Sequence, residues 1–108
     1  MKKDISPEEK IKDVIRQQLQ TIYDPEIPVS IYDLGMIYDI IADKDKNIKI
    51  VMTLTAPNCP VAESLPQEVR ERVMAATGSE NVTVEVTFDP PWSPDMMSEE
   101  AKLTLGYL

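Results

Sequence analysis

The residue in this sequence best suited to nucleophilic or metal-binding chemistry is its single cysteine, Cys59, in the stretch TLTAPNCPVAE. Pro57 and Pro60 bracket it where a strand pattern ends and a helix pattern begins. A thiol at a helix N-terminus meets unpaired amide donors and the positive end of the helix dipole, and both favour the nucleophilic, metal-binding thiolate. The alternative is a small buried apolar residue, and composition alone leaves these interpretations evenly balanced.

A second candidate is the tripeptide Asp24-Pro25-Glu26, which follows an expected helix. Two carboxylates beside a proline can bind a metal, act as an acid/base pair, or accept hydrogen bonds from loop amides, and the last is the commonest role. Asp33 and Gly35 follow in the motif YDLG, where we expect the glycine to adopt a positive φ in a turn into a strand.

The third candidate is the proline-rich stretch DPPWSP, residues 89–94, which contains the only tryptophan, Trp92, and is followed by Met96 and Met97. An aromatic ring and methionines beside prolines form either a small core under the loop or an exposed patch that binds a partner. Both interpretations stay open, and Trp92 and Met96 are the candidate partner-binding residues.

The composition excludes several classes of site. Because the chain has no histidine, it contains no imidazole base, no Ser-His-Asp or Cys-His site, and no histidine metal ligand. One cysteine excludes an intrachain disulfide, a CxxC redox pair and a four-cysteine metal site within one subunit. A metal held by Cys59 would therefore need other ligands or a second chain.

The charge and the N-terminus bear on partners and location. Nineteen acidic and eleven basic residues give a net charge of -8, which argues against binding to nucleic acid or to an anionic membrane. The N-terminus has no apolar leader, and no run approaches the roughly 18 apolar residues of a membrane span. We therefore expect a cytoplasmic protein with a free thiol.

The elements that must position these residues follow from hydrophobic periodicity, and we expect one domain over residues 1–108. Ser6, Pro7 and Glu9 form a capping-box pattern that begins a helix over residues 6–23. Strands over residues 36–43 and 47–55 form a hairpin around the turn DKDKN, and a third strand covers residues 81–88. The expected buried faces are Ile11, Val14, Ile15, Leu19 and Ile22 of the helix, Ile48, Ile50, Met52 and Leu54 of the second strand, and Val82, Val84, Val86 and Phe88 of the third. Thr53, Thr83, Glu85 and Thr87 are expected on the opposite, polar face of the sheet.

The second helix has an ambiguous start. It begins either near Pro60, which places Pro66 inside the helix with a kink, or at Ser64 as N-cap with Gln67 as its capping-box partner. We favour the start near Pro60. Leu65, Val69, Val73 and Ala76 form its apolar face, Gly78 ends it, and a short helix follows within SEEAKLTLGYL.

The order αββαβα predicts a two-layer α+β fold with a small three-stranded mixed sheet and its main helices on one face. The polar face of that sheet suits solvent or self-association, so a homodimer is one expectation. If the second and third strands are parallel, the chain leaves Thr55 and Phe88 at the same end of the sheet. Cys59 would then lie near Trp92.

Taken together, the segments DPEIPVSIYDLGMIYDI, MTLTAPNCPVAE and VTFDPPWSPDMMSEEAKLTLGYL resemble the SufT and PaaD type of metal-sulfur cluster biosynthesis protein, of the iron-sulfur cluster assembly domain superfamily. The resemblance spans nearly the whole chain. It implies the fold expected above and a non-enzymatic accessory role in maturing iron-sulfur proteins, with assembly machinery and client apoproteins as partners. It also implies one small site formed by Asp24, Glu26, Thr53, Thr55 and Cys59, with Asp33 and Gly35 shaping the loop.

In this interpretation Cys59 transiently binds iron or a cluster, or recognises a client, and no cofactor is tightly bound. Two alternatives remain. One is a thiol-dependent peroxide reductase, in which Thr55 and Arg70 or Arg72 stabilise the thiolate, although a resolving cysteine is lacking. The other is a protein-interaction module that uses Trp92 and Met96 and buries Cys59 as a structural residue.

Overall fold

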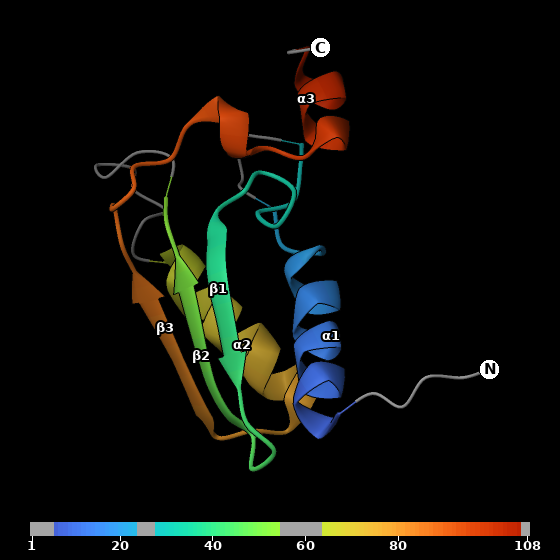
Figure 1. The fold of residues 1–108 in the computed structure, drawn as a ribbon, viewed down its shortest axis with the longest axis vertical. Helices are drawn as coiled ribbons and strands as arrows, with labels where there is room; N and C mark the ends of the chain where they lie inside the picture. The colour runs from blue at the N-terminus through green and yellow to red at the C-terminus, as the bar shows by residue number, and fades with distance from the viewer. Residues whose placement is uncertain (1–5, 24–27, 55–63, 107–108) are drawn as a thin grey trace, which may run out of the picture.

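The computed structural model describes residues 6–23, 28–54 and 64–106. Their elements follow the predicted αββαβα order, and no helix among these residues is long and apolar enough to cross a membrane (Figure 1). The elements are α1 (Pro7–Leu19), β1 (Ile37–Ala42), β2 (Asn47–Met52), α2 (Ser64–Thr77), β3 (Asn81–Val86), a 3-10 turn η2 (Pro94–Met96) and α3 (Glu99–Leu105).

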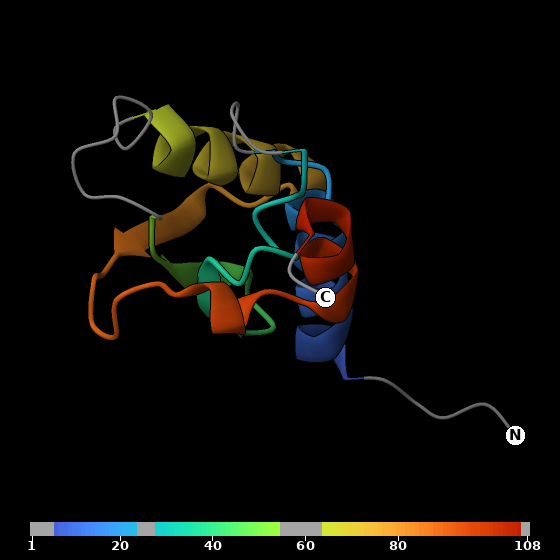
Figure 2. The ribbon, with the colours of Figure 1, turned by 90° about the horizontal axis from the view of Figure 1, so that it is seen from above.

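The sheet has the order β1-β2-β3, with β1 antiparallel and β3 parallel to the central strand β2. Ile50 pairs with Ile40 on one side and with Val84 on the other, so apolar side chains from all three strands point to the same face. Helices α1 and α2 cover that face, as the view from above shows (Figure 2). The predicted two-layer α+β fold is confirmed.

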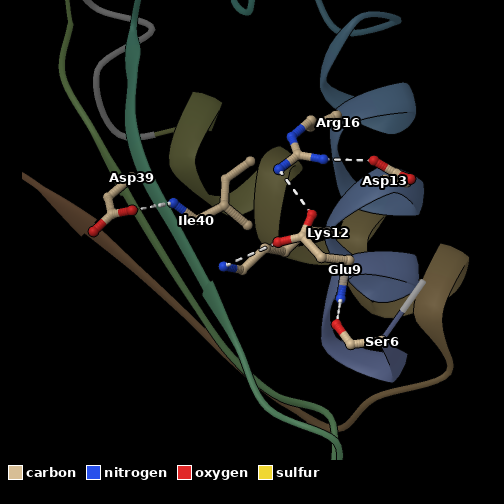
Figure 3. Close-up of polar contacts among 7 residues, drawn as sticks. All are labelled: Ser6, Glu9, Lys12, Asp13, Arg16, Asp39 and Ile40. Atoms are coloured by element: carbon tan, nitrogen blue, oxygen red, sulfur yellow. Dashed lines mark hydrogen bonds and ion pairs between the residues drawn. The ribbon is translucent and has the colours of Figure 1, made fainter. Parts of the chain in front are cut away.

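The N-terminus of α1 follows half of the predicted capping box. The Ser6 hydroxyl accepts a hydrogen bond of 3.2 Å from the Glu9 amide. The Glu9 carboxylate, however, lies 3.9 Å from the Lys12 ammonium and 3.8 Å from the Arg16 guanidinium (Figure 3). Glu9 thus supports the next turns of the helix instead of bonding back to Ser6.

Three predictions about buried faces are wrong. Val14 is 38% exposed, because it lies at the margin of the α1 stripe while Ile15 occupies the centre. Phe88 is 44% exposed, because β3 ends at Val86 and the alternation of faces ends with it. Thr53, expected on the polar face, is fully buried, because it lies beyond the end of β2 and its amide donates to the Met36 carbonyl at 2.8 Å.

Helix α2 begins at Ser64, which leaves Pro66 in the first turn of one uninterrupted helix. A proline there sacrifices no intrahelical hydrogen bond, since the first amides of a helix have no partner within it. The favoured start near Pro60 lies outside the described residues. Gly78 ends the helix with φ of +73°, as predicted, and the buried residues of α2 are Leu65, Val69 and Val73.

The hairpin turn between β1 and β2 is organised by the Asp43 side chain. One carboxylate oxygen accepts hydrogen bonds from the Asp45 amide at 2.9 Å and the Asn47 amide at 3.0 Å. The other oxygen accepts one from the Asn47 side-chain amide at 3.0 Å. These bonds, led by that from the Asn47 backbone, lower the pKa of Asp43. The charged carboxylate is therefore part of the folded turn.

We predict a pH-dependent contribution of Asp43 to stability. Because its pKa is lower when folded than when unfolded, the contribution is complete above the unfolded pKa and is lost as the pH falls through the folded pKa. The free energy of unfolding of the protein, compared with that of Asp43→Asn by urea denaturation, should differ by a constant amount above about pH 5 and converge below it. Parallel pH profiles for the two proteins would contradict the role of this carboxylate.

Candidate functional site

One turn joins the ends of several elements, and we call residues 30–36 the 30–36 turn. Its Ile31 amide donates to the Ile22 carbonyl just after α1 at 2.8 Å, and its Met36 carbonyl accepts from the Thr53 amide just after β2 at 2.8 Å. A bond of 3.1 Å from the Met36 amide to the Ile31 carbonyl closes the turn. The chain that follows α1 and the chain that follows β2 are thus both attached to this turn.

The shape of the turn comes from Asp33 and Gly35. The Asp33 amide donates to the Ser30 hydroxyl at 3.2 Å, and that hydroxyl donates to the Asp33 carboxylate at 3.1 Å. Gly35 has φ of +80°, which confirms the predicted positive φ. The apolar side chains of the loop, Val29, Ile31, Leu34 and Met36, are buried in the core.

The C-terminal segment crosses the same turn. The Trp92 indole N–H donates to the Leu34 carbonyl at 2.7 Å, and the Ser98 amide donates to the Asp33 carbonyl at 2.8 Å. A Cβ atom on Gly35 would overlap the Met96 carbonyl, so only glycine permits so close an approach. The Trp92 ring is partly buried against the core and partly exposed, so both predicted roles, a small core under the loop and a partner-binding patch, stay open.

Tyr38 is a contact that the sequence reasoning missed. Its hydroxyl donates to the Pro90 carbonyl at 2.8 Å and lies 3.5 Å from the Met96 sulfur. The residue lies where the register of β1 shifts between Ile37 and Asp39, which is the mark of a bulge. A tyrosine in a strand is ordinary in sequence, so no pattern pointed to it. Met96 is half-buried beside this hydroxyl.

Most of the predicted site residues lie outside the described residues, namely Asp24, Glu26, Thr55 and Cys59. Of the five residues expected to form one small site, Thr53 alone is described. It is fully buried, and its hydroxyl donates to the Leu54 carbonyl at 3.5 Å, while its binding role stays a prediction. Within residues 6–23, 28–54 and 64–106, no three His, Cys, Asp or Glu residues are placed to hold a metal ion.

The described elements nevertheless place the starting points of both segments that carry the predicted site residues at one end of the molecule. The C-terminal end of α1, the carboxyl end of β2 and the N-terminal end of α2 all lie at the end where the C-terminal segment crosses (Figure 1). Strands β2 and β3 are parallel, and a bond of 2.9 Å from the Thr87 amide to the Met52 carbonyl continues their pairing. The condition for bringing Cys59 near Trp92 is therefore met, and their proximity stays a prediction.

A wide groove of about 570 Å³ lies elsewhere, at the hairpin end of the sheet. Asp43, Asn47 and Asn81 line it, together with Arg70, whose guanidinium N–H donates to the Val82 carbonyl at 2.9 Å. No residue predicted to form the iron site contributes to it, and Arg70 was named only for the peroxide reductase alternative. We therefore assign the candidate site to the end of the molecule at which the 30–36 turn lies.

Comparison with known proteins agrees with this architecture. A crystal structure of a domain of unknown function from Bacillus anthracis superposes with a TM-score of 0.86, at 33% identity, over 94% of this chain and 96% of the other. The chain therefore has the fold of a known class of small α+β domain. In this class a three-stranded mixed sheet carries its helices mainly on one face.

The family follows from sequence. A family model described as "Iron-sulfur cluster assembly protein" matches residues 12–86, and the chain belongs to this family, as the resemblance predicted. It is 50% identical over 97 residues to a protein of Porphyromonas gingivalis named "Fe-S protein maturation auxiliary factor", covering 90% of this chain and 91% of that protein. It is 37% identical over 99 residues to the Bacillus subtilis protein "Fe-S protein maturation auxiliary factor YitW", covering 92% and 97%.

We predict that Gly35→Ala destabilises the protein far more than Gly106→Ala. Both glycines have similar positive φ, +80° and +85°, so the backbone strain of an alanine is nearly the same at each. A Cβ at position 106 meets nothing within 4 Å, whereas one at position 35 overlaps the Met96 carbonyl. We expect losses in the free energy of unfolding of about 1 kcal/mol for Gly106→Ala and about 3 kcal/mol for Gly35→Ala. Equal losses in urea denaturation would show that the close approach is unimportant.

Proposed function

We propose that this protein is an accessory factor in the maturation of iron-sulfur proteins, in which Cys59 binds iron or a cluster in transit or recognises the client. Family membership and the names of the relatives support the general role. The observation that carries the finer role is the 30–36 turn, which bonds Ile22 and Thr53. Ile22 shortly precedes the Asp24-Glu26 motif, and Thr53 shortly precedes Thr55 and Cys59.

The residue types suit a carrier better than a permanent holder of a cluster. A thiolate is a good ligand for iron, and carboxylates such as Asp24 and Glu26 complete a ligand set or orient it. One thiol per chain cannot hold a cluster alone. A two-iron cluster shared by two chains would have two cysteines, with the other positions filled by carboxylates or small thiols. A cluster held in this way would be labile, as cargo must be.

The described residues explain how the fold would support this chemistry. Thr53 is fully buried and bonded to the turn, so the segment that carries Cys59 starts from a fixed point. Because chemistry placed on loops depends on a rigid base, this anchoring would hold Cys59 and Thr55 close to the carboxylates. The half-buried side chains of Trp92 and Met96 lie at the same end and form our proposed docking surface for client apoproteins.

We predict that Cys59→Ser abolishes cluster binding and client maturation together. After anaerobic reconstitution with iron and sulfide, the unchanged protein should show iron-sulfur absorption bands in visible light, and the variant should not. Serine is nearly the same size as cysteine, so thermal unfolding should change little. Activation of an apoenzyme client by the variant should fall at least about tenfold, the loss expected when a metal ligand or its support is removed. If bands are absent from both proteins and the variant still matures the client, Cys59 is not a ligand.

A second substitution separates ligand binding from client docking. Met96→Gln keeps the length of the side chain but makes its exposed portion polar. We predict that cluster reconstitution at Cys59 is unchanged, whereas client activation falls several-fold, the typical loss when an apolar contact at an interface is removed. A matched substitution outside the proposed surface, Met74→Gln on α2, should leave both readouts unchanged. Equal client activation by all these proteins would remove Met96 from the docking surface.

A further inference from the structure

An apolar groove lies between α1 and α2 at the hairpin end of the molecule, away from the candidate site. It has a volume of about 210 Å³ and is lined by Lys10, Ile11, Val14, Lys46, Ala76 and Thr77. Val14, which its helical position predicts to be buried, is instead 38% exposed here. Among the residues that the structure describes, neither lysine forms an ion pair. The groove therefore combines aliphatic side chains with two lysines that form no ion pair with the described residues, in a protein whose net charge is negative.

Lys46 occupies its place in this groove at a conformational cost. Its φ is +63°, and among the described residues it is the only non-glycine with a positive φ. The left-handed conformation costs a lysine about 1–2 kcal/mol, which a glycine would avoid. The positive φ belongs to the hairpin turn, in which the Lys46 amide donates to the Asp43 carbonyl at 3.1 Å. The Lys46 ammonium lies 3.8 Å from where a Cβ on Gly78 would be, at the C-terminal end of α2, where a positive charge is favourable.

The chain also carries a surface of opposite charge with an exposed leucine, on the outer face of α3. Leu103 is 63% exposed, the highest value among the exposed large apolar side chains of the described residues. Glu99 and Glu100 precede it by four and three residues, so all three side chains lie on one face of the helix. Ala101, which is buried, faces the other way. We call Glu99, Glu100 and Leu103 the acidic-leucine face.

The two surfaces lie too far apart for one chain to join them. Helix α3 is at one end of the longest axis of the molecule, while the N-terminal half of α1 and the C-terminal end of α2 are at the other end (Figure 1). A contact between them therefore needs a second copy, and in the arrangement that we consider two copies lie antiparallel, with each acidic-leucine face at the groove of its partner. Such a pair has two identical contacts and closes, as two-fold symmetric dimers do.

We propose that this protein forms a reciprocal homodimer in which the acidic-leucine face of each chain docks in the groove of the other. Leu103 covers the exposed Val14, and Glu99 and Glu100 lie beside Lys10 and Lys46. Burial of the leucine supplies attraction, and the charges select the orientation. The net charge of -8 opposes association at long range, but physiological salt screens charges beyond about 8 Å. This dimer keeps the candidate-site ends of the two chains apart, so it is distinct from the pairing through which two chains would share a cluster, and its test does not depend on Cys59.

Sedimentation equilibrium from about 10 μM to about 1 mM tests the proposal, since this range covers the affinities of weak dimers. The unchanged protein should approach the mass of two copies. Leu103→Asp should lower the association constant at least about tenfold, because it replaces the apolar contact with Val14 by a charged carboxylate that loses its hydration against aliphatic side chains. Ile41→Asp is the matched control: Ile41 is 48% exposed on the sheet, outside both surfaces, and its substitution should leave the dimer intact.

Charge inversion makes the test specific for this pairing. The double variants Lys10→Glu with Lys46→Glu, and Glu99→Lys with Glu100→Lys, should each be monomeric, because groove and α3 then carry the same sign. An equimolar mixture should dimerise again, because both contacts are complementary in the mixed pair. A monomer at about 1 mM for the unchanged protein, or a dimer that survives in either double variant alone, would overturn the proposal.

Discussion

The backbone hydrogen bonds of the 30–36 turn are the constraint on which one end of this molecule depends. The turn bonds Ile22 after α1, Thr53 after β2, and Trp92 and Ser98 of the C-terminal segment, which are widely separated in sequence. Buried backbone groups must find partners, so each bond fixes the position of a different segment. Gly35 allows the segments to approach this closely, because any side chain there would meet the backbone of Met96.

This arrangement distinguishes a packed core from the end of the molecule that holds the candidate site. The sheet, α1 and α2 form a packed core in which Ile15, Ile50 and Val69 are fully buried. The chain segments proposed to do chemistry leave this core at the ends of its elements, as binding residues commonly do. In our account the turn transmits the rigidity of the core to the Asp24-Glu26 and Thr55-Cys59 segments. A site that passes a cluster on must hold its protein ligands in fixed positions. It must also offer too few ligands to bind the cluster permanently.

The sequence predicted the regular elements well, because local rules decide them. Ser6 before Pro7 marked the start of α1, Gly78 marked the end of α2, and the alternation through Ile48 and Ile50 gave the buried face of the sheet. Local rules failed beyond the strand ends, where Thr53 turns inward and Phe88 turns outward. There, tertiary hydrogen bonds and the ends of the strands decide which face a side chain occupies.

The loops could not be predicted from periodicity, since their buried residues follow none. Ile31 and Leu34 belong to the core although their stretch has no helical or strand pattern. The bond from Tyr38 to Pro90 joins residues far apart in sequence, and nothing local signals it. The candidate site was found differently, through the family resemblance of its motifs. Composition alone left Cys59 divided between a core residue and a reactive one.

The single thiol allows a direct measurement of the central claim, that Cys59 shares one site with Asp24 and Glu26. A nitroxide label attached to Cys59 broadens the NMR signals of nearby amides. We predict strong broadening at Asp24, Glu26 and Trp92, with full intensity at Asp45 in the hairpin turn. Undiminished Asp24 and Glu26 signals, in a labelled protein that keeps its fold, would contradict the account.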